Sequence, residues 1–333
     1  KRYKYLPLYV FGIITLSILI YLNIPLFFSY EKSELENKIC KNFNVECSIS
    51  GKVKYRFFPT PRIKIEDLVI EDFINKKKNL GIIKDVAIKL PLNNLLNKEK
   101  LVFSKIELKK AKINFDLNQL DKYKKFLKKK FNSKPIKLSN SKILFLDGKK
   151  EITTITNINL KYKTNDERDN LIFTGIFLDE DIYFNLKNKK NKKDPLKILT
   201  LKVLNSKTKV NIFSSNQDKN LINGNISFKK NKNKFTSTFD YHDDKIVLNK
   251  ANLKNDFLDG KLNGEVKFLP YFNFNLNVDL NGINFNTLHG NIVALDEKSK
   301  KNLLKIDKKI NGQLNITANK IFSKRTLIDS FES

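Results

Sequence analysis

The chain has 333 residues, 41% of them hydrophobic, so it is long enough to bury a sizeable core. Its net charge of +29 invites a nucleic-acid function, but only five of the 64 basic residues are Arg, which supplies most bidentate contacts to phosphates and bases. Lys, Asn, Ile and Phe are abundant together, a composition typical of an AT-biased genome. We therefore expect no nucleic-acid partner, and attraction to anionic lipid surfaces is the alternative explanation of the charge.

The first element is a stretch of 23 uncharged residues, 6–28. As a helix it would cover roughly 34 Å, enough to cross a hydrocarbon core of about 30 Å. A cleaved signal peptide is the alternative, but no small-residue cleavage site follows Phe28. Basic residues precede the stretch and acidic residues follow it, which favours a cytoplasmic N-terminus. We predict a single-pass membrane anchor over 1–30, with the remainder of the chain on the far side of the membrane.

Residues 31–50 are predicted to form a juxtamembrane helix and a linker. The sequence Ser-Glu-Leu-Glu has capping-box spacing, and apolar residues follow at helical intervals, so we expect a short amphipathic helix over 33–43. The two cysteines, Cys40 and Cys47, lie close by. In an oxidising compartment they could form a disulfide between the helix end and the next strand, and two unrelated buried thiols are the alternative.

Beyond this linker the apolar residues recur with a period of two, which is typical of strands with one apolar and one polar face. The clearest strand is predicted over 271–281, where Phe, Leu and Val alternate with Asn and Asp. Two separate strands are expected over 103–108 and 112–117. Helical spacing recurs in two lysine-rich segments, 118–131 and 299–308. The first fits a helix that caps an open end of the sheet, or one that lies on an anionic membrane.

A loose repeat indicates a run of similar hairpins. The segment Asn223–Phe228 is echoed at Asn263–Phe268 and at Asn311–Ile316, each beginning with Asn-Gly and continuing with alternating residues. We interpret each copy as a turn followed by a strand. The intervals of 40 and 48 residues are uneven, which argues against a solenoid or a propeller and fits a long meander.

We predict a mainly β fold for 51–333: a long antiparallel sheet, folded over into a groove, with a few short capping helices. An antiparallel sheet with one apolar face must cover that face. Because helices are scarce here, the apolar faces either pack on each other, as in a β-sandwich or barrel, or line an unfilled groove for acyl chains. We also expect the chain to be truncated at its C-terminus.

Several stretches resemble the AsmA family. Besides the membrane helix, they are GKVKYRFFPTPRIKIEDLVI at 51–70, VAIKLPLNNLLN at 86–97, FSKIELKKAKINF at 103–115, ILFLD at 143–147, ITNINL at 155–160 and the strand run over 260–288. A Trp-containing turn that the family pattern leads us to expect near 114–120 has no Trp here, and the lysine-rich segment after it looks like an insertion.

The resemblance implies an anchor in the bacterial inner membrane, a periplasmic β-groove and a role in outer-membrane biogenesis. It implies phospholipid as the ligand, moved between the inner and outer membranes, with outer-membrane assembly components as further partners. An alternative from another class is a non-transporting assembly or tethering factor that affects outer-membrane protein insertion. A cationic surface for anionic polymers is a third alternative.

Alternation along the strands nominates the side chains that would line the groove. They are Phe145, Phe184, Ile226, Phe228, Phe268, Phe272, Phe274, Leu276, Val278 and Leu280. We expect no catalytic residues, metal or cofactor, because His242 and His289 lack partners at metal-binding spacing and no nucleotide-binding or hydrolase glycine motif occurs. The sequence therefore predicts a protein that is not an enzyme.

Overall fold

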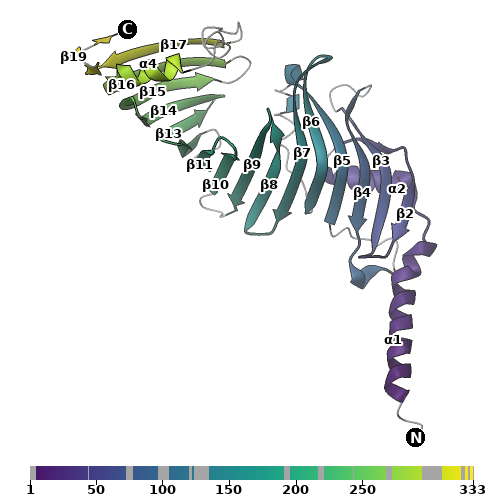
Figure 1. Cartoon of the computed structure of the whole chain (residues 1–333). Helices are drawn as coiled ribbons and strands as arrows, with labels where there is room; N and C mark the ends of the chain where they lie inside the picture. The colour runs from purple at the N-terminus through teal and green to yellow at the C-terminus, as the bar shows by residue number, and fades with distance from the viewer. Residues whose placement is uncertain are drawn as a thin grey trace. The chain divides into compact units, whose positions relative to one another are not determined.

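The fold is built mainly of strands, with an apolar helix at the N-terminus and few other helices (Figure 1), which confirms the predicted mainly β class. The computed structural model describes residues 5–43, 45–72, 78–96, 105–119, 122–123, 135–190, 196–216, 221–242, 244–267, 272–294, 310–323, 327–328 and 331–332. Contacts divide the chain into two compact units. The first is Lys1–Asn165 with Asn170–Asp181, and the second is Asp166–Asp169 with Ile182–Ser333.

The first unit contains the N-terminal helices and the strands up to most of β8. Its elements are α1 (Leu6–Asn23), η2 (Ile24–Phe27), α2 (Lys32–Phe43), β1 (Cys47–Ile49), β2 (Val53–Arg56), β3 (Arg62–Glu71), β4 (Asn79–Lys89), η3 (Leu92–Asn94), β5 (Lys105–Asp116), η4 (Leu117–Gln119), β6 (Ile136–Asp147), β7 (Lys150–Thr164) and β8 (Arg168–Phe177).

Helix α1 is apolar on all sides and stands away from the strands (Figure 1). With η2 it forms a stretch from Pro7 to Phe27 that is long and apolar enough to cross a membrane, and only 6% of its most apolar window is buried. A helix that is apolar all round needs an apolar environment on every side. The predicted anchor is therefore present as one continuous helical stretch.

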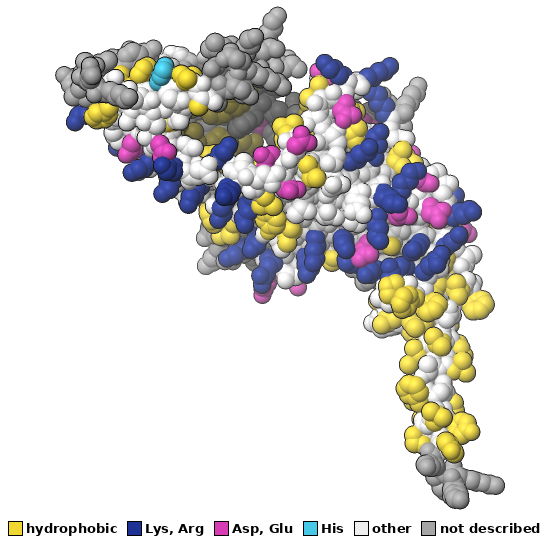
Figure 2. Space-filling view, in the orientation of Figure 1, with side chains coloured by type: hydrophobic (Ala, Val, Ile, Leu, Met, Phe, Trp, Pro, Cys, Tyr) yellow, Lys and Arg dark blue, Asp and Glu magenta, His cyan; other side chains and the backbone are white. Residues whose placement is uncertain are grey.

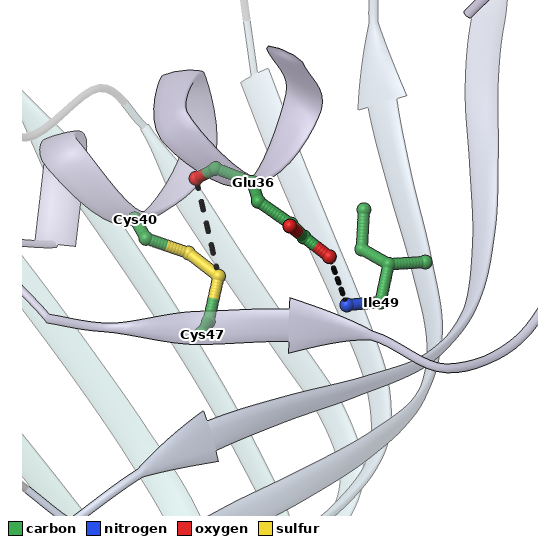
Figure 3. Close-up of a disulfide and its surroundings, with 4 residues drawn as sticks. All are labelled: Glu36, Cys40, Cys47 and Ile49. Carbon is green, nitrogen blue, oxygen red and sulfur yellow. Dashed lines mark hydrogen bonds between the residues drawn. A yellow bond between two sulfur atoms is a disulfide. The ribbon is translucent and has the colours of Figure 1, made fainter. Parts of the chain in front are cut away.

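Helix α2 confirms the short helix expected after the anchor and begins one residue earlier, at Lys32. Cys40 in its last turn forms a disulfide with Cys47 in β1 (Figure 3). The Glu36 carboxylate accepts a hydrogen bond from the backbone N–H of Ile49 at 2.5 Å. Two links thus hold β1 against the helix.

The apolar face of the first sheet lies under α2, which passes behind the strands in Figure 1. Leu35 and Ile39 of the helix pack against the strands, where Ile63 and Ile88 are 0% exposed and Val86 is 1% exposed. Burial of such side chains contributes about 1.5–3 kcal/mol each. This unit therefore has a filled core.

The first sheet is mixed, which corrects the prediction of an antiparallel sheet. Neighbouring strands from β2 to β5 pair antiparallel, and β1 also pairs with β3, but β6 lies parallel to β5. A parallel pair needs a crossover between its strands, here the segment 117–135. Strand β7 pairs antiparallel with β6, and Gly175 of β8 lies against Ile155 and Ile158 of β7.

A line of irregular positions crosses this sheet. Positive φ angles occur at Asp67, Lys110, Asn140 and Asn157, in β3, β5, β6 and β7, and the register of β6 with β7 shifts at this level. In β5 the inward side chains step from Leu108 to Ala111 across Lys110, so one strand replaces the two that were expected over 103–108 and 112–117. A register shift such as that between β6 and β7 bends a strand and increases its twist.

The second unit is a longer run of strands. Its elements are β9 (Glu180–Lys189), β10 (Leu196–Val203), β11 (Thr208–Asn216), β12 (Ile222–Lys230), β13 (Asn233–His242), β14 (Lys245–Lys254), β15 (Leu258–Lys267), β16 (Phe272–Asn284), α4 (Phe285–Val293), β17 (Ile310–Ala318), β18 (Ile321–Phe322), β19 (Leu327–Ile328) and β20 (Phe331–Glu332). Strands β9 to β16 pair antiparallel in chain order, whereas β17 and β18 pair parallel to β16.

The strand predicted over 271–281 is confirmed by β16. The interpretation of the three Asn-Gly copies as turns is wrong, because Gly224, Gly264 and Gly312 lie inside strands. Two of them face an aromatic ring, because a Cβ atom on Gly224 would lie 2.7 Å from the Phe239 ring and one on Gly312 would lie 2.5 Å from the Phe274 ring. Gly264 instead lies close to the backbone of Asn275 and Leu276, so these glycines make room for side chains or backbone of the adjacent strand.

Two predicted helices fall largely outside the described residues. Of 118–131, the structure describes the end of η4 and residues 122–123, which are helical, and none of 299–308 is described. Helix α4 was not predicted. Its N-terminus is capped by the Asn284 side chain, which accepts a hydrogen bond from the Thr287 N–H at 3.1 Å.

Candidate functional site

The strand register places the apolar side chains of the second unit on one face. Residues directly opposite each other in neighbouring strands point to the same side of a sheet. Phe184 of β9 lies opposite Leu201, Leu201 lies opposite Val210, and Val210 lies opposite Phe228. Phe228 in turn lies opposite Phe235 of β13. A continuous apolar row therefore crosses five strands.

The same face continues to β17. Phe235 lies opposite Leu253 of β14, and Ala251, two residues before Leu253, lies opposite Leu262. Leu262 then lies opposite Val278, which lies opposite Ile316 of β17. Nine strands thus share one apolar face, which we call the long apolar face. At about 4.8 Å between strands it extends for roughly 40 Å.

The opposite face of this sheet is polar. Asn277 of β16 donates to the Asn263 Oδ1 atom at 3.1 Å, and Asn315 of β17 donates to the Asn277 Oδ1 atom at 2.8 Å. Thr317 donates to Asp279 at 2.7 Å. These side chains alternate with the apolar ones in the same strands, so the two faces of the sheet are chemically distinct.

Seven of the nominated lining residues lie on strands of the long apolar face and point to it: Phe184, Ile226, Phe228, Phe274, Leu276, Val278 and Leu280. Phe272 opposes Ile310 at the start of β16 and is 36% exposed. Phe268 lies outside the described residues. Sequence reasoning missed the residues of β10, β11, β14 and β17, whose shorter alternating runs are recognised only once their neighbours are known.

Phe145 lies apart from this set, in β6 of the first unit. Its ring is stacked on Phe115 with centroids 6.1 Å apart, and Phe115 meets Tyr123 edge to face at 5.2 Å. Tyr123 is 4% exposed. Phe145 therefore belongs to an aromatic cluster filled by the protein's own side chains.

Many side chains of the long apolar face are covered incompletely, whereas Ala251 and Leu280 are buried, at 2% and 4% exposed. Leu201, Val210, Phe228 and Leu276 are all only partly buried, and Leu314 of β17 is 47% exposed. Hydrophobic side chains are visible in a hollow of this unit in Figure 2. Within the described residues, α4 is the only helix of this unit, and none of its residues is buried. Within the part of the chain that the structure describes, this sheet therefore has no helical cover like that of α2 in the first unit.

The described residues offer little for catalysis or metal binding. Among them, no group of three or more His, Cys, Asp or Glu side chains is placed to hold a metal ion. His289 stacks against Phe285 with ring centroids 6.4 Å apart. The feature that can act chemically is thus an extended apolar surface, which binds hydrocarbon without forming bonds.

Comparisons with known proteins identify the first part of the chain. The model of the AsmA family matches residues 1–175, which is more than half of the sequence and nearly the whole first unit. Searches of curated proteins and of solved structures gave no match. The membrane-type helix, the strand pattern after it and the family match agree with one another. The chain belongs to the AsmA family.

Proposed function

We propose that this protein is anchored in the bacterial inner membrane by α1 and carries phospholipid acyl chains along the long apolar face, between the inner and outer membranes. The observation that carries the proposal is the continuity of that face over β9–β17, with no helix packed over it among the described residues. Its extent of roughly 40 Å exceeds the ~15 Å depth of one hydrocarbon leaflet. Acyl chains can therefore lie along it at several positions.

The proposed location in the periplasm rests on three features. One helix is suited to span a membrane. Lys1, Arg2 and Lys4 precede it, which favours a cytoplasmic N-terminus. The disulfide between Cys40 and Cys47 follows it, and disulfides persist in oxidising compartments such as the periplasm. Together they support a single-pass protein whose strands lie outside the cytoplasm.

Photo-crosslinking from neighbouring positions of β16 tests this function. Benzoylphenylalanine at Leu276 or Val278 would point to the long apolar face, whereas the same group at Asn275 or Asn277 would point to the polar face. After irradiation of intact cells, we expect phospholipid adducts from 276 and 278 and none from 275 and 277.

Other outcomes of this experiment decide against the proposal. Equal lipid adducts from both faces would show that the sheet merely touches a membrane. Adducts from 276 and 278 to outer-membrane proteins, without lipid, would favour the assembly or tethering alternative. Absence of any adduct from the inward positions would show that the face is closed by the protein itself.

A further inference from the structure

Exposed apolar side chains from three separate segments gather where α1 ends. They come from η2, from the turn between β2 and β3, and from the segment after β4, and we call them the base collar: Leu26, Phe27, Phe57, Phe58, Leu92 and Leu96. Phe27 is 88% exposed, Phe58 is 76% exposed and Leu96 is 63% exposed. In Figure 2 hydrophobic side chains cover α1 and gather at its end, and Lys and Arg side chains begin directly beyond them.

Hydrogen bonds fix the collar segments to the end of the helix. The Tyr21 hydroxyl donates to the backbone carbonyl of Leu92 at 2.5 Å, and the Tyr55 hydroxyl donates to that of Leu22 at 2.6 Å. Pro25 is fully buried beside them. The last turn of α1 and the strands of the first unit are therefore held together, and the collar has a defined level relative to the helix.

The collar residues point outward although a residue between them in the sequence is buried. Leu95 is 0% exposed, whereas Leu92 and Leu96 on either side are 58% and 63% exposed. Leu26, Phe57 and Phe58 border one cleft of about 660 Å³. Large exposed apolar groups that cluster in this way mark a contact with a membrane or a protein.

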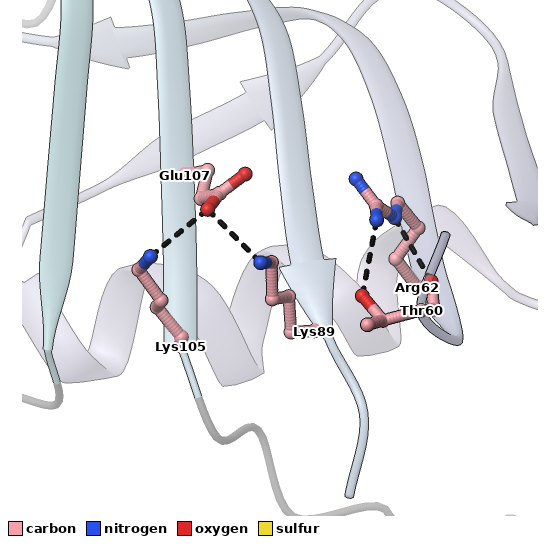
Figure 4. Close-up of polar contacts among 5 residues, drawn as sticks. All are labelled: Thr60, Arg62, Lys89, Lys105 and Glu107. Carbon is pink, nitrogen blue, oxygen red and sulfur yellow. Dashed lines mark hydrogen bonds and ion pairs between the residues drawn. The ribbon is translucent and has the colours of Figure 1, made fainter. Parts of the chain in front are cut away.

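A row of four cations lies immediately beyond the collar, at the ends of β2, β3, β4 and β5. Arg56 lies opposite Arg62, Arg62 opposite Lys89, and Lys89 opposite Lys105. We call these four residues the cationic row, and Figure 4 shows three of them, Arg62, Lys89 and Lys105. Like charges directly opposite each other destabilise a sheet, so this row needs an anionic partner.

A carboxylate of the protein pairs with two of the four cations. Glu107 pairs with Lys105 at 3.0 Å and with Lys89 at 3.2 Å. Arg62 donates to the Thr60 carbonyl at 2.9 Å and to its hydroxyl at 3.0 Å. Among the described residues no carboxylate pairs with Arg56 or Arg62. The Arg56 guanidinium and the other N–H groups of Arg62, which match phosphate geometry, are therefore placed to bind an anionic ligand.

The positive charge is concentrated at this end of the four strands. One step further along the same face, Lys54 and Lys64 accompany Glu107, and the next step carries Lys52 and Lys109 with Glu66 and Asp85. Residues of all three levels line one cleft of about 230 Å³, although Lys89 and Lys105 do not. By strand register, the first level thus holds four cations, the second adds one carboxylate to two lysines, and the third balances two lysines with two carboxylates.

We infer that the first unit is seated in the membrane, with the base collar in the interfacial region of the leaflet into which α1 emerges and the cationic row on the phosphates of its anionic lipids. Aromatic and aliphatic side chains at the acyl boundary with basic residues at headgroup level are the signature of interfacial binding. This inference rests on the proposed anchoring by α1. It would hold the unit at a fixed height and angle on the bilayer.

The absence of Trp from the chain allows a clean test. Single Trp residues are introduced as Phe58→Trp and Leu96→Trp in the collar, as Leu16→Trp in α1, and as Ile152→Trp at the start of β7. Ile152 is 49% exposed. Strands β5 and β6 both run away from the collar, and β7 starts where β6 ends, so Ile152 lies at the opposite end of the sheet from the collar. The full chain is reconstituted in vesicles whose lipids carry bromine at a defined acyl depth.

We expect strong bromine quenching and blue-shifted emission for Trp at 16, 58 and 96, and neither effect at 152. Quenching at 16 without quenching at 58 and 96 would overturn the seating while leaving the anchor in place. No quenching at 16 would instead contradict the anchoring on which the proposed function depends.

The cationic row is tested separately with vesicles of phosphatidylcholine alone or mixed with phosphatidylglycerol. We expect quenching of Phe58→Trp to increase severalfold when phosphatidylglycerol is present, and the increase to disappear in Arg56→Gln/Arg62→Gln. Lys52→Gln/Lys109→Gln, at the balanced level, is the matched control and should keep the increase. Equal quenching in both kinds of vesicle would contradict the proposed contact between the cationic row and anionic lipid phosphates.

Discussion

In the first unit the apolar face of the sheet lies under α2, and Ile63 and Ile88 retain no exposure. In the second unit Leu201 and Leu276 occupy equivalent inward positions but stay partly exposed. The strands of both units alternate in the same way, so alternation alone does not decide whether a face is filled. Among the described residues, the difference between the units is the helix that covers the sheet in the first. The same strand pattern thus gives a packed core in one unit and a partly exposed apolar face in the other.

The largest expected difference between the units is the effect of removing an inward side chain. Ile88→Ala should lower the free energy of unfolding of the first unit by about 2–5 kcal/mol, because it leaves a closed cavity. Leu276→Ala should cost about 1 kcal/mol or less, because its site is open. Urea-dependent proteolysis of the full chain, read from fragments of each unit, measures both. Equal losses would mean that both faces are filled.

Breaking the disulfide should affect the first unit alone. Cys40 and Cys47 are separated by 7 residues, and closing a loop of that size stabilises a fold by about 2–3 kcal/mol in the chain-entropy account. Cys40→Ala/Cys47→Ala should therefore shift the urea midpoint of the first unit downward and leave the second unit unchanged. A similar shift in both units would contradict their independence.

A smaller effect is expected from Glu107. Burial alone would raise the pKa of its carboxyl, but hydrogen bonds and charge from Lys105 and Lys89 outweigh burial and lower the pKa to about 2 from 4.5. Because the folded pKa is the lower one, this stability is present above pH 4.5 and is lost as the pH falls from there toward 2. Both lysines are partly exposed, so we expect about 1 kcal/mol after screening.

Glu107→Gln checks this prediction. It should remove that pH dependence from the first unit's unfolding while strengthening binding to phosphatidylglycerol vesicles, because the cationic row loses the carboxylate that pairs with Lys89 and Lys105. Glu265→Gln, which breaks the exposed pair between Glu265 and Lys245 in the second unit, is the control and should change neither. Weaker vesicle binding by Glu107→Gln would contradict the role assigned to the row.

Much of the fold could be predicted from local sequence. The helix over 33–43 and the strand over 271–281 follow from periodicity, which depends only on neighbouring residues. The irregular positions with positive φ could not be predicted in this way, although the apolar period steps by three from Leu108 to Ala111, because Lys110 carries no glycine signal. The parallel pairing of β5 with β6 depends on a crossover, which local pattern does not encode.

Only those residues of the candidate site that lie in a long alternating strand could be predicted, because local periodicity does not show which strands pair. Phe274 and Leu276 lie in a long alternating strand and could be nominated from it. Leu201 and Leu262, on other strands, are assigned to the same face only by the strand register. The cationic row was missed entirely, because Arg56, Arg62, Lys89 and Lys105 are spread over 50 residues of sequence and meet only in the sheet.

The most direct test is the amount of phospholipid that stays with the purified full chain, measured by mass spectrometry. The triple variant Leu201→Asn/Leu262→Asn/Val278→Asn makes the long apolar face polar. Its matched control, Lys202→Asn/Lys261→Asn/Asp279→Asn, changes the adjacent residues of the same strands on the opposite face. We predict a severalfold loss of retained phospholipid in the first variant and none in the control. Unchanged phospholipid in the first variant would contradict the account.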